Sequence, residues 1–216
     1  MSWIRRILRA APGVCAAGLL TSCTDIGGDL PSIYQVAKNL WQNSSEVPLR
    51  EAAATPYASI GVRVGGNDQF MLVMATQTNG QQLWTSDARV AITTRDGRIV
   101  RTAGFGRDLS GLNYTGNGGD SGGRIVWQAD FADLGLYSIP VTCRRGASKD
   151  ESIVVLGTAL HTRRIEEACT ADSSQIKWSY TNIFWLDPEN GLAWRSLQYV
   201  HPKLPPFEIT VLRPPA

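Results

Sequence analysis

The sequence predicts a mainly β protein, an antiparallel sandwich or partly closed barrel with one short N-terminal helix. Three observations lead to this prediction. About ten short segments either alternate apolar and polar residues with a period of two or are continuously apolar. Combinations of Gly, Asp, Asn and Pro that favour turns separate these segments. The regular succession of strand and helix that builds a parallel sheet does not occur along the chain.

The expected helix lies close to the N-terminus. Apolar residues between positions 33 and 41 recur at helical spacing, so that one face of this segment is apolar. Asn43, Ser44 and Ser45 then end the pattern. Residues 46–56 contain two prolines and are expected to form a linker rather than a regular element.

The expected strands begin after this linker. Residues 60–64 alternate, and residues 70–75 are continuously apolar, which favours a central strand buried on both faces. Asp187-Pro188-Glu189-Asn190-Gly191 predicts the turn of a hairpin. Further strands are expected over residues 82–86, 90–94, 99–102, 124–131, 137–144, 153–165, 176–186, 192–200 and 207–211.

The first 22 residues are predicted to be a lipoprotein signal peptide. Three arginines precede the apolar stretch 10–20, which is too short to span a bilayer. The stretch leads into Leu20-Thr21-Ser22-Cys23, an aliphatic residue and two small residues before a cysteine, which is the lipobox pattern. We therefore expect cleavage before Cys23 and lipidation of its thiol. An ordinary signal peptide with a chance cysteine is the alternative.

The cleavage site gives the expected domain order. A lipidated tether with the short helix and the linker occupies residues 23–56, and the β domain occupies residues 57–216. Thr24 rather than an aspartate follows the lipidated cysteine, which favours sorting to the outer membrane, with the domain facing the periplasm. The acyl chains make the membrane itself the first expected partner.

Charge and cysteine content narrow the class of protein further. Three of the 21 basic residues and none of the 19 acidic residues precede Cys23, so 18 basic and 19 acidic groups remain after cleavage. This balance argues against nucleic acid as a partner. Cys143 and Cys169 remain as a pair in an oxidising compartment, which favours a disulfide over two buried free thiols.

One motif resembles an active-site sequence. Gly119-Asp120-Ser121-Gly122-Gly123 matches the surroundings of the nucleophile in chymotrypsin-like proteases. In that family the histidine base precedes the serine, but the two histidines here, His161 and His201, both follow it. Without a base the serine is inert, and a glycine-rich loop yields such a string by composition. Two isolated histidines also argue against a zinc site. We therefore expect no catalytic residue, no metal and no cofactor.

Five tryptophans lie in or beside the expected strands. Because tryptophan in a strand usually buries a large apolar area, we interpret them as core residues. A surface that stacks on sugar rings is the alternative. Trp185 and Trp194 are expected to be related across the hairpin. The five residues are Trp84, Trp127, Trp178, Trp185 and Trp194.

Three longer segments resemble the YjbF/GfcB family of group 4 capsule polysaccharide lipoproteins. They are residues 58–65, residues 94–104 and the stretch from Asn182 to Ser196, and the closing Leu212-Arg213-Pro214-Pro215 fits as well. The lipobox at Cys23 agrees with the same family. The shared motifs are turns, so they indicate the family without marking a catalytic site.

The resemblance implies a function in secretion. Members are expected to be periplasm-facing lipoproteins of the outer membrane, encoded with genes for capsule or exopolysaccharide export. The expected partners are an outer-membrane β-barrel or another polysaccharide-export protein, or the polysaccharide. We therefore predict a non-catalytic accessory protein that acts by binding. A glycan-processing periplasmic enzyme and a purely structural envelope lipoprotein are the alternatives.

Overall fold

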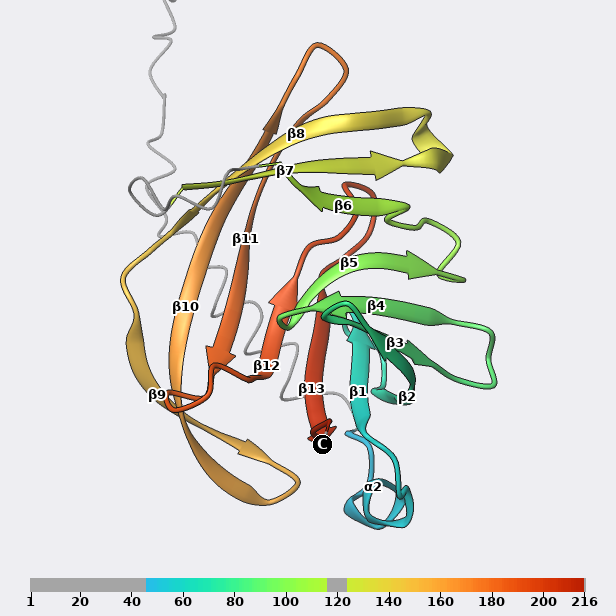
Figure 1. The fold of residues 1–216 in the computed structure, drawn as a ribbon, viewed down its shortest axis with the longest axis vertical. Helices are drawn as coiled ribbons and strands as arrows, with labels where there is room; N and C mark the ends of the chain where they lie inside the picture. The colour runs from blue at the N-terminus through green and yellow to red at the C-terminus, as the bar shows by residue number, and fades with distance from the viewer. Residues whose placement is uncertain (1–45, 116–123, 216) are drawn as a thin grey trace, which may run out of the picture. The chain divides into compact units, whose positions relative to one another are not determined.

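Thirteen antiparallel strands form one continuous sheet in the computed structural model, which describes residues 46–115 and 124–215 (Figure 1). These residues all belong to one compact unit. The strands are β1 (Ser59–Val64), β2 (Phe70–Thr78), β3 (Gln81–Thr85), β4 (Ala91–Arg95), β5 (Arg98–Ala103), β6 (Gly111–Tyr114), β7 (Arg124–Phe131), β8 (Leu136–Arg145), β9 (Lys149–Val155), β10 (Thr158–Asp172), β11 (Lys177–Leu186), β12 (Ala193–Gln198) and β13 (Phe207–Arg213).

The strand order brings the two ends of the sheet together. It runs β5-β4-β3-β2-β1-β13-β12-β11-β10-β8-β7-β6, and β9 pairs with β10 outside this path. Strands β5 and β6 lie side by side (Figure 1), and the N–H of Thr102 donates to the carbonyl oxygen of Leu109 at 2.9 Å. The sheet is therefore nearly closed, which confirms the prediction of a mainly β, partly closed barrel rather than a sandwich.

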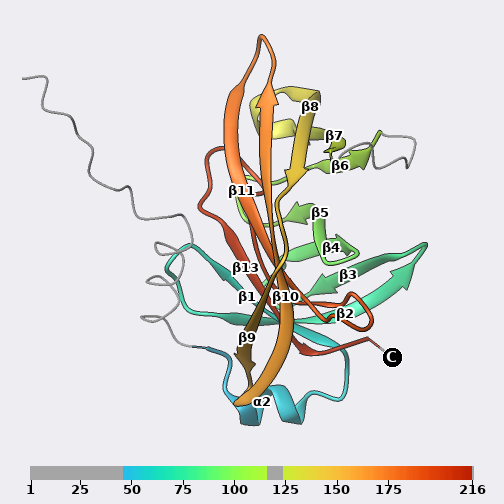
Figure 2. The same ribbon diagram turned by 90° about the vertical axis from the view of Figure 1, so that its left-hand side faces the viewer.

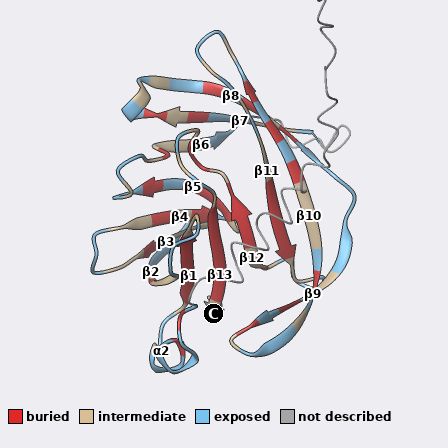
Figure 3. Ribbon diagram, turned by 180° about the vertical axis from the view of Figure 1, so that it is seen from behind, coloured by how far each residue is buried: buried red, intermediate tan, exposed pale blue. Residues whose placement is uncertain are grey.

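Apolar side chains on the inner faces of the strands form the main core. Figure 3 shows buried positions concentrated along β1, β12 and β13. A second, smaller cluster lies where β9 covers β11 and β12, and it includes Ile153, Val155, Ile183, Trp185 and Leu197. Strands β10 and β11 pair over ten residues and run side by side along the molecule (Figure 2). The main core includes Ile60, Val62, Leu72, Trp84, Ile92, Ile99, Phe131, Ile139, Val141, Phe207 and Ile209.

The helix that the structure describes differs from the expected one. The segment 33–41 lies outside the described residues. Helix α2 (Leu49–Ala54) instead occupies the segment 46–56 that was predicted to be a linker, so that prediction was wrong. Pro48 occupies the N-cap position of this helix, with φ −59°. The sequence Leu-Arg-Glu-Ala-Ala-Ala that follows consists of strong helix formers. Among the described residues, no helix is long and apolar enough to cross a membrane.

Two strand predictions also need correction. Residues 70–75 are not buried on both faces, because only Leu72 of this run is fully buried in β2. The predicted strand 153–165 is in fact the hairpin β9–β10. Its turn contains Leu156 and Gly157, which both have positive φ values, at 48° and 80°. The strand prediction for residues 124–131 coincides with β7.

Candidate ligand-binding site

The sequence-predicted residues fall in three places. Cys23 and the motif from Gly119 to Gly123 lie outside the described residues. Cys143 of β8 and Cys169 of β10 lie opposite each other in the ladder between these neighbouring strands. They form a disulfide, as the sequence predicts. Both sulfurs lie in the main core, beside the carboxylate of Glu167. Because the sulfurs are bonded to each other, this group of possible ligand atoms does not provide a metal site.

Of the five tryptophans, Trp84 and Trp185 are fully buried, as predicted for core residues. The other three are half-buried and pack against the main core at its margin. Trp185 lies opposite Arg195 in the β11–β12 ladder, and Trp194 immediately precedes Arg195 in β12. Trp194 packs against the cluster that contains Trp185, so the two are neighbours across the hairpin.

His201 has a structural role. It is completely buried, and its Nδ1 accepts a hydrogen bond from the backbone N–H of Lys203 at 3.1 Å. The other ring nitrogen, Nε2, therefore carries the hydrogen and donates to Asp133 at 3.1 Å. Both nitrogens of His201 are thus occupied. His161 lies exposed on β10, opposite Ser152.

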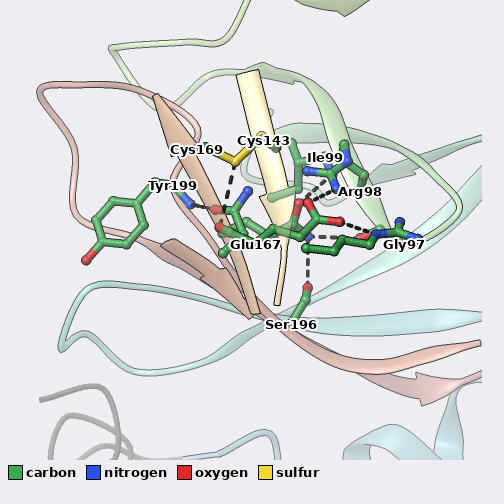
Figure 4. A network of polar contacts seen from close by, with 11 residues as sticks. Gly97, Arg98, Ile99, Cys143, Glu167, Cys169, Ser196 and Tyr199 are labelled. Atoms are coloured by element: carbon green, nitrogen blue, oxygen red, sulfur yellow. Dashed lines mark hydrogen bonds and ion pairs between the residues drawn. A yellow bond between two sulfur atoms is a disulfide. The ribbon is translucent and has the colours of Figure 1, made fainter. Parts of the chain in front are cut away.

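A buried ion-pair network joins three strands that are far apart in the sequence. The guanidinium of Arg98, on β5, donates to the carboxylate of Glu167, on β10 (Figure 4). Arg145, on β8, donates its Nε–H to the other carboxylate oxygen at 2.8 Å. The guanidinium of Arg98 also lies 4.9 Å from the ring centre of Trp127 and 5.0 Å from that of Phe184. These contacts tie β5, at one end of the strand order, to β8 and β10, which lie close to the other end.

The environment of Glu167 favours its ionised form. Burial alone would raise the pKa of this carboxyl. The attraction of Arg98 and Arg145 and the hydrogen bonds from both outweigh that cost, so the pKa of Glu167 is lowered from its ordinary value. The carboxylate is therefore a stable negative charge and a poor general acid.

A second buried group lies on β1, β12 and β13. Arg63 donates from Nη1 to Glu208 at 2.7 Å, and the Nε of Arg195 lies 3.7 Å from the same carboxylate. Burial raises the pKa of Glu208 despite these two cations. Arg63 and Glu208 face each other in the β1–β13 ladder, so the pair links neighbouring strands.

The side-chain amide of Gln198 fixes the β4–β5 hairpin on β12. Its Oε1 accepts from the N–H of Ile99 at 2.9 Å, and its Nε2 donates to the carbonyl of Gly97 and to Oγ of Ser196, each at 2.8 Å. Gly97 approaches Ala193 so closely that a Cβ at this position would lie 2.5 Å from the Ala193 Cβ. The Asp96-Gly97 turn is thereby held against β12.

Two hollows open where these turns meet, and together we call them the turn cleft. The larger has a volume of about 550 Å³ and is lined by Gln77, Gln82, Trp84, Trp194 and Pro215, among others. The smaller, of about 230 Å³, is lined by Trp127, Phe184 and the ion-pair network. Both hollows are lined by Asp96 and Gly191. The larger lies within the range of about 300–1,000 Å³ that is usual for ligand sites.

Sequence reasoning missed the polar residues of this cleft. Arg98 and Glu167 are 69 positions apart and Gln198 lies 99 positions from Ile99. No local pattern connects such residues, because only the closure of the sheet brings them together. The sequence features that do fall in this region are the two turn signals, Asp96-Gly97 and Asp187 to Gly191. Three of the tryptophans singled out from the sequence also line it, Trp84 and Trp194 in the larger hollow and Trp127 in the smaller.

The sequence profile of the YjbF family, described as group 4 capsule polysaccharide lipoprotein, matches residues 34–212. The chain belongs to this family. This confirms the resemblance noted from the sequence.

Two relatives come from Escherichia coli K12. The lipoprotein GfcB is 23% identical over 178 residues, covering 76% of this chain and 80% of GfcB. The lipoprotein YjbF is 25% identical over 166 residues, covering 73% of this chain and 76% of YjbF.

A solved structure supports the fold of this YjbF-family chain. The crystal structure of the hypothetical lipoprotein YmcC from Escherichia coli K12 superposes with a TM-score of 0.61 at 19% identity. The match covers 86% of this chain and 97% of YmcC. Family membership makes this protein a capsule-related lipoprotein, a class that lipid anchors to a membrane.

Proposed function

We propose that this protein is a non-catalytic accessory component of capsule or exopolysaccharide secretion. Acyl chains on Cys23 hold it on the outer membrane, where the β domain faces the periplasm. It acts by binding an outer-membrane β-barrel or another export protein, or the polysaccharide. The observation that carries this proposal is the family match over residues 34–212, which includes every described strand except the last residue of β13.

The chemistry of the described residues supports binding rather than catalysis. Three of the ionisable groups that line the smaller hollow of the turn cleft form ion pairs with one another, since Arg98 and Arg145 both contact Glu167. Both nitrogens of His201 are engaged, and the cysteine pair is oxidised. Within residues 46–115 and 124–215, no serine, threonine or cysteine is hydrogen-bonded to a histidine that could serve as its base.

The lipid anchor supports a role beside a membrane partner. Confinement to two dimensions raises the effective concentration of the domain near such a partner without any new contact. A binding surface of modest affinity is then sufficient for a stable association. A polysaccharide that is held at its export channel would meet the anchored domain at a raised effective concentration in the same way.

Deletion of the gene, with complementation by the wild-type gene, tests the proposal. We expect surface polysaccharide to fall in the deletion strain and to return on complementation. In parallel, crosslinking of the acylated protein in its native envelope, followed by mass spectrometry, should recover an export component or bound glycan. Unchanged surface polysaccharide would overturn the proposal and favour the structural alternative. Shortening of glycan chains by the purified protein would favour the enzyme.

A further inference from the structure

The turn cleft has a floor that is rigid before any ligand arrives. Asp96 and Gly191 both have positive φ values, at 50° and 76°, so both turns are tight. Gln198 fixes the first turn through hydrogen bonds to the backbone of Gly97 and Ile99. The close approach of Gly97 to Ala193 prevents this turn from moving closer to β12. A preformed floor reduces the ordering cost of binding.

The larger hollow presents hydrogen-bonding groups in fixed orientations. The indole N–H of Trp84 donates to Oγ1 of Thr94 at 2.8 Å, and that hydroxyl donates to Oε1 of Gln82 at 2.9 Å. The amide nitrogen of Gln82 is therefore left as a donor, with no partner among the described residues. Asn190 is held within its own turn, since its Oδ1 accepts from the N–H of Leu192 at 2.8 Å and its side chain also hydrogen-bonds to the carboxylate of Asp187.

An aromatic surface lies beside these amides. The indole N–H of Trp194 donates to Oδ2 of Asp187 at 3.1 Å, which fixes the plane of the half-buried ring at the wall of the hollow. Planar amides, a carboxylate and an indole face match the chemistry of a sugar ring, which offers hydroxyls around its rim and C–H groups on its face. A purely apolar ligand would leave the amide nitrogen of Gln82 unpaired.

The smaller hollow adds positive charge. Its charged lining consists of three arginines against two carboxylates, an excess of one positive charge. Arg98 forms an ion pair with Glu167. By contrast, the terminal nitrogens of Arg145 and the guanidinium of Arg95 have no hydrogen-bonding partner among the residues that the structure describes. Both side chains are exposed. They are placed to receive an anionic group, such as the carboxylate of an acidic sugar.

We propose that the turn cleft binds a short segment of an acidic polysaccharide, with sugar rings in the larger hollow and an acidic group beside Arg95 and Arg145. This inference rests on the proposed function and names the substrate class and the site. A hollow of this size suits a few sugar units, whereas a folded protein partner needs a broad surface of about 800 Å² per side.

The test uses the full-length acylated protein in detergent and two probes. One is a size-fractionated hydrolysate of the surface polysaccharide of the source strain. The other is the same hydrolysate after chemical reduction of its carboxylates to alcohols. Titration calorimetry should show binding of the native fragments, weakened by added salt. The reduced fragments should bind about tenfold more weakly.

Two variants separate the hollows. Arg95→Ala should weaken binding of native fragments about fivefold to tenfold and leave the reduced fragments unaffected. Gln77→Ala, at an exposed residue of the larger hollow, should weaken both probes. Arg144→Ala is the matched control. It removes the same charge from an exposed side chain next to Arg145, and neighbouring strand residues point to opposite faces.

The outcomes are distinct. Equal loss of affinity in Arg95→Ala and Arg144→Ala would overturn the assignment of the cleft, and so would failure of wild-type protein to bind the native fragments. If deletion of the gene nevertheless lowers surface polysaccharide, the proposed function stands and only this site fails. If deletion changes nothing, the proposed function fails independently of any binding result.

Discussion

Glu167 carries a buried negative charge whose stability depends on two arginines. Replacement of Arg98 by methionine keeps most of the apolar bulk but leaves the carboxylate with Arg145 alone. Because Arg98 and Glu167 are 9% and 1% exposed, little solvent screens their interaction. We expect Arg98→Met to lower the free energy of unfolding by about 3–5 kcal/mol, as for other buried pairs that lose one partner. Urea unfolding followed by tryptophan fluorescence measures this loss.

Arg107→Ala serves as the control for that measurement. Arg107 pairs with Asp133 at 3.4 Å, but its side chain is 49% exposed, and Asp133 keeps its bond to His201. Removal of the Arg107 side chain should lower the free energy of unfolding by no more than about 1 kcal/mol. A similarly small cost for Arg98→Met would show that the network does not stabilise the closed sheet.

The ionisation of Glu167 should make the free energy of unfolding depend on pH. The pKa of Glu167 is lower in the folded chain than its ordinary value of 4.5. The stabilisation from its charge is therefore fully present above the unfolded pKa and is lost as the pH falls through the folded pKa. We expect the free energy of unfolding to differ most between wild type and Glu167→Gln near neutral pH, and this difference to shrink below about pH 4. A difference that stays constant with pH would contradict the assignment.

At the scale of elements, the contact between two turns is set by a single glycine. Gly97 has φ +75°, and a Cβ there would lie 2.5 Å from that of Ala193. Gly97→Ala combines backbone strain with this clash, so we expect a loss of stability of about 2–4 kcal/mol. Thermal or urea unfolding of the variant measures it.

Gly80→Ala isolates the backbone contribution. Gly80 has a similar φ of +73°, but nothing lies within 4 Å of a Cβ there, so its cost should be about 1 kcal/mol. The double variant Gly97→Ala with Ala193→Gly should recover the part that comes from the clash. Equal losses of stability in Gly97→Ala and Gly80→Ala would show that a clash with Ala193 adds nothing to the backbone strain.

The elements show what sequence patterns can and cannot predict. The β7 strand and the turn from Asp187 to Gly191 were predicted because alternation and turn residues are local signals. The β9–β10 hairpin was missed because Leu156, an apolar β-compatible residue, occupies a turn position with positive φ. Helix α2 was missed because the prolines around it indicate a break in a strand as readily as a helix start.

At the scale of the whole molecule, the candidate site could not have been predicted from the sequence. Asp96 belongs to one hairpin and Gly191 to another, and their meeting depends on the order of all the strands between them. The residues that hold the cleft, Arg98, Glu167 and Gln198, come from three strands. Alternation predicts which side of a strand a residue faces, but not which distant strand it will meet.

The position of the whole domain in the cell depends on one predicted residue, Cys23. Each buried CH₂ of an acyl chain contributes about 0.8 kcal/mol to membrane binding, and several chains together give firm anchoring. Cys23→Ser removes the acceptor thiol, so we expect the protein to lose incorporation of labelled palmitate and to move from the membrane fraction to the soluble fraction. The β domain itself should still fold, since the core residues that the structure describes, from Val47 onward, lie well away from position 23 in the chain. If accessory binding depends on confinement at the membrane, surface polysaccharide should fall in this variant even when the protein accumulates to wild-type levels. Full secretion by an abundant, unanchored variant would show that anchoring is dispensable, and labelling of Cys23→Ser with palmitate would place the lipid on another residue.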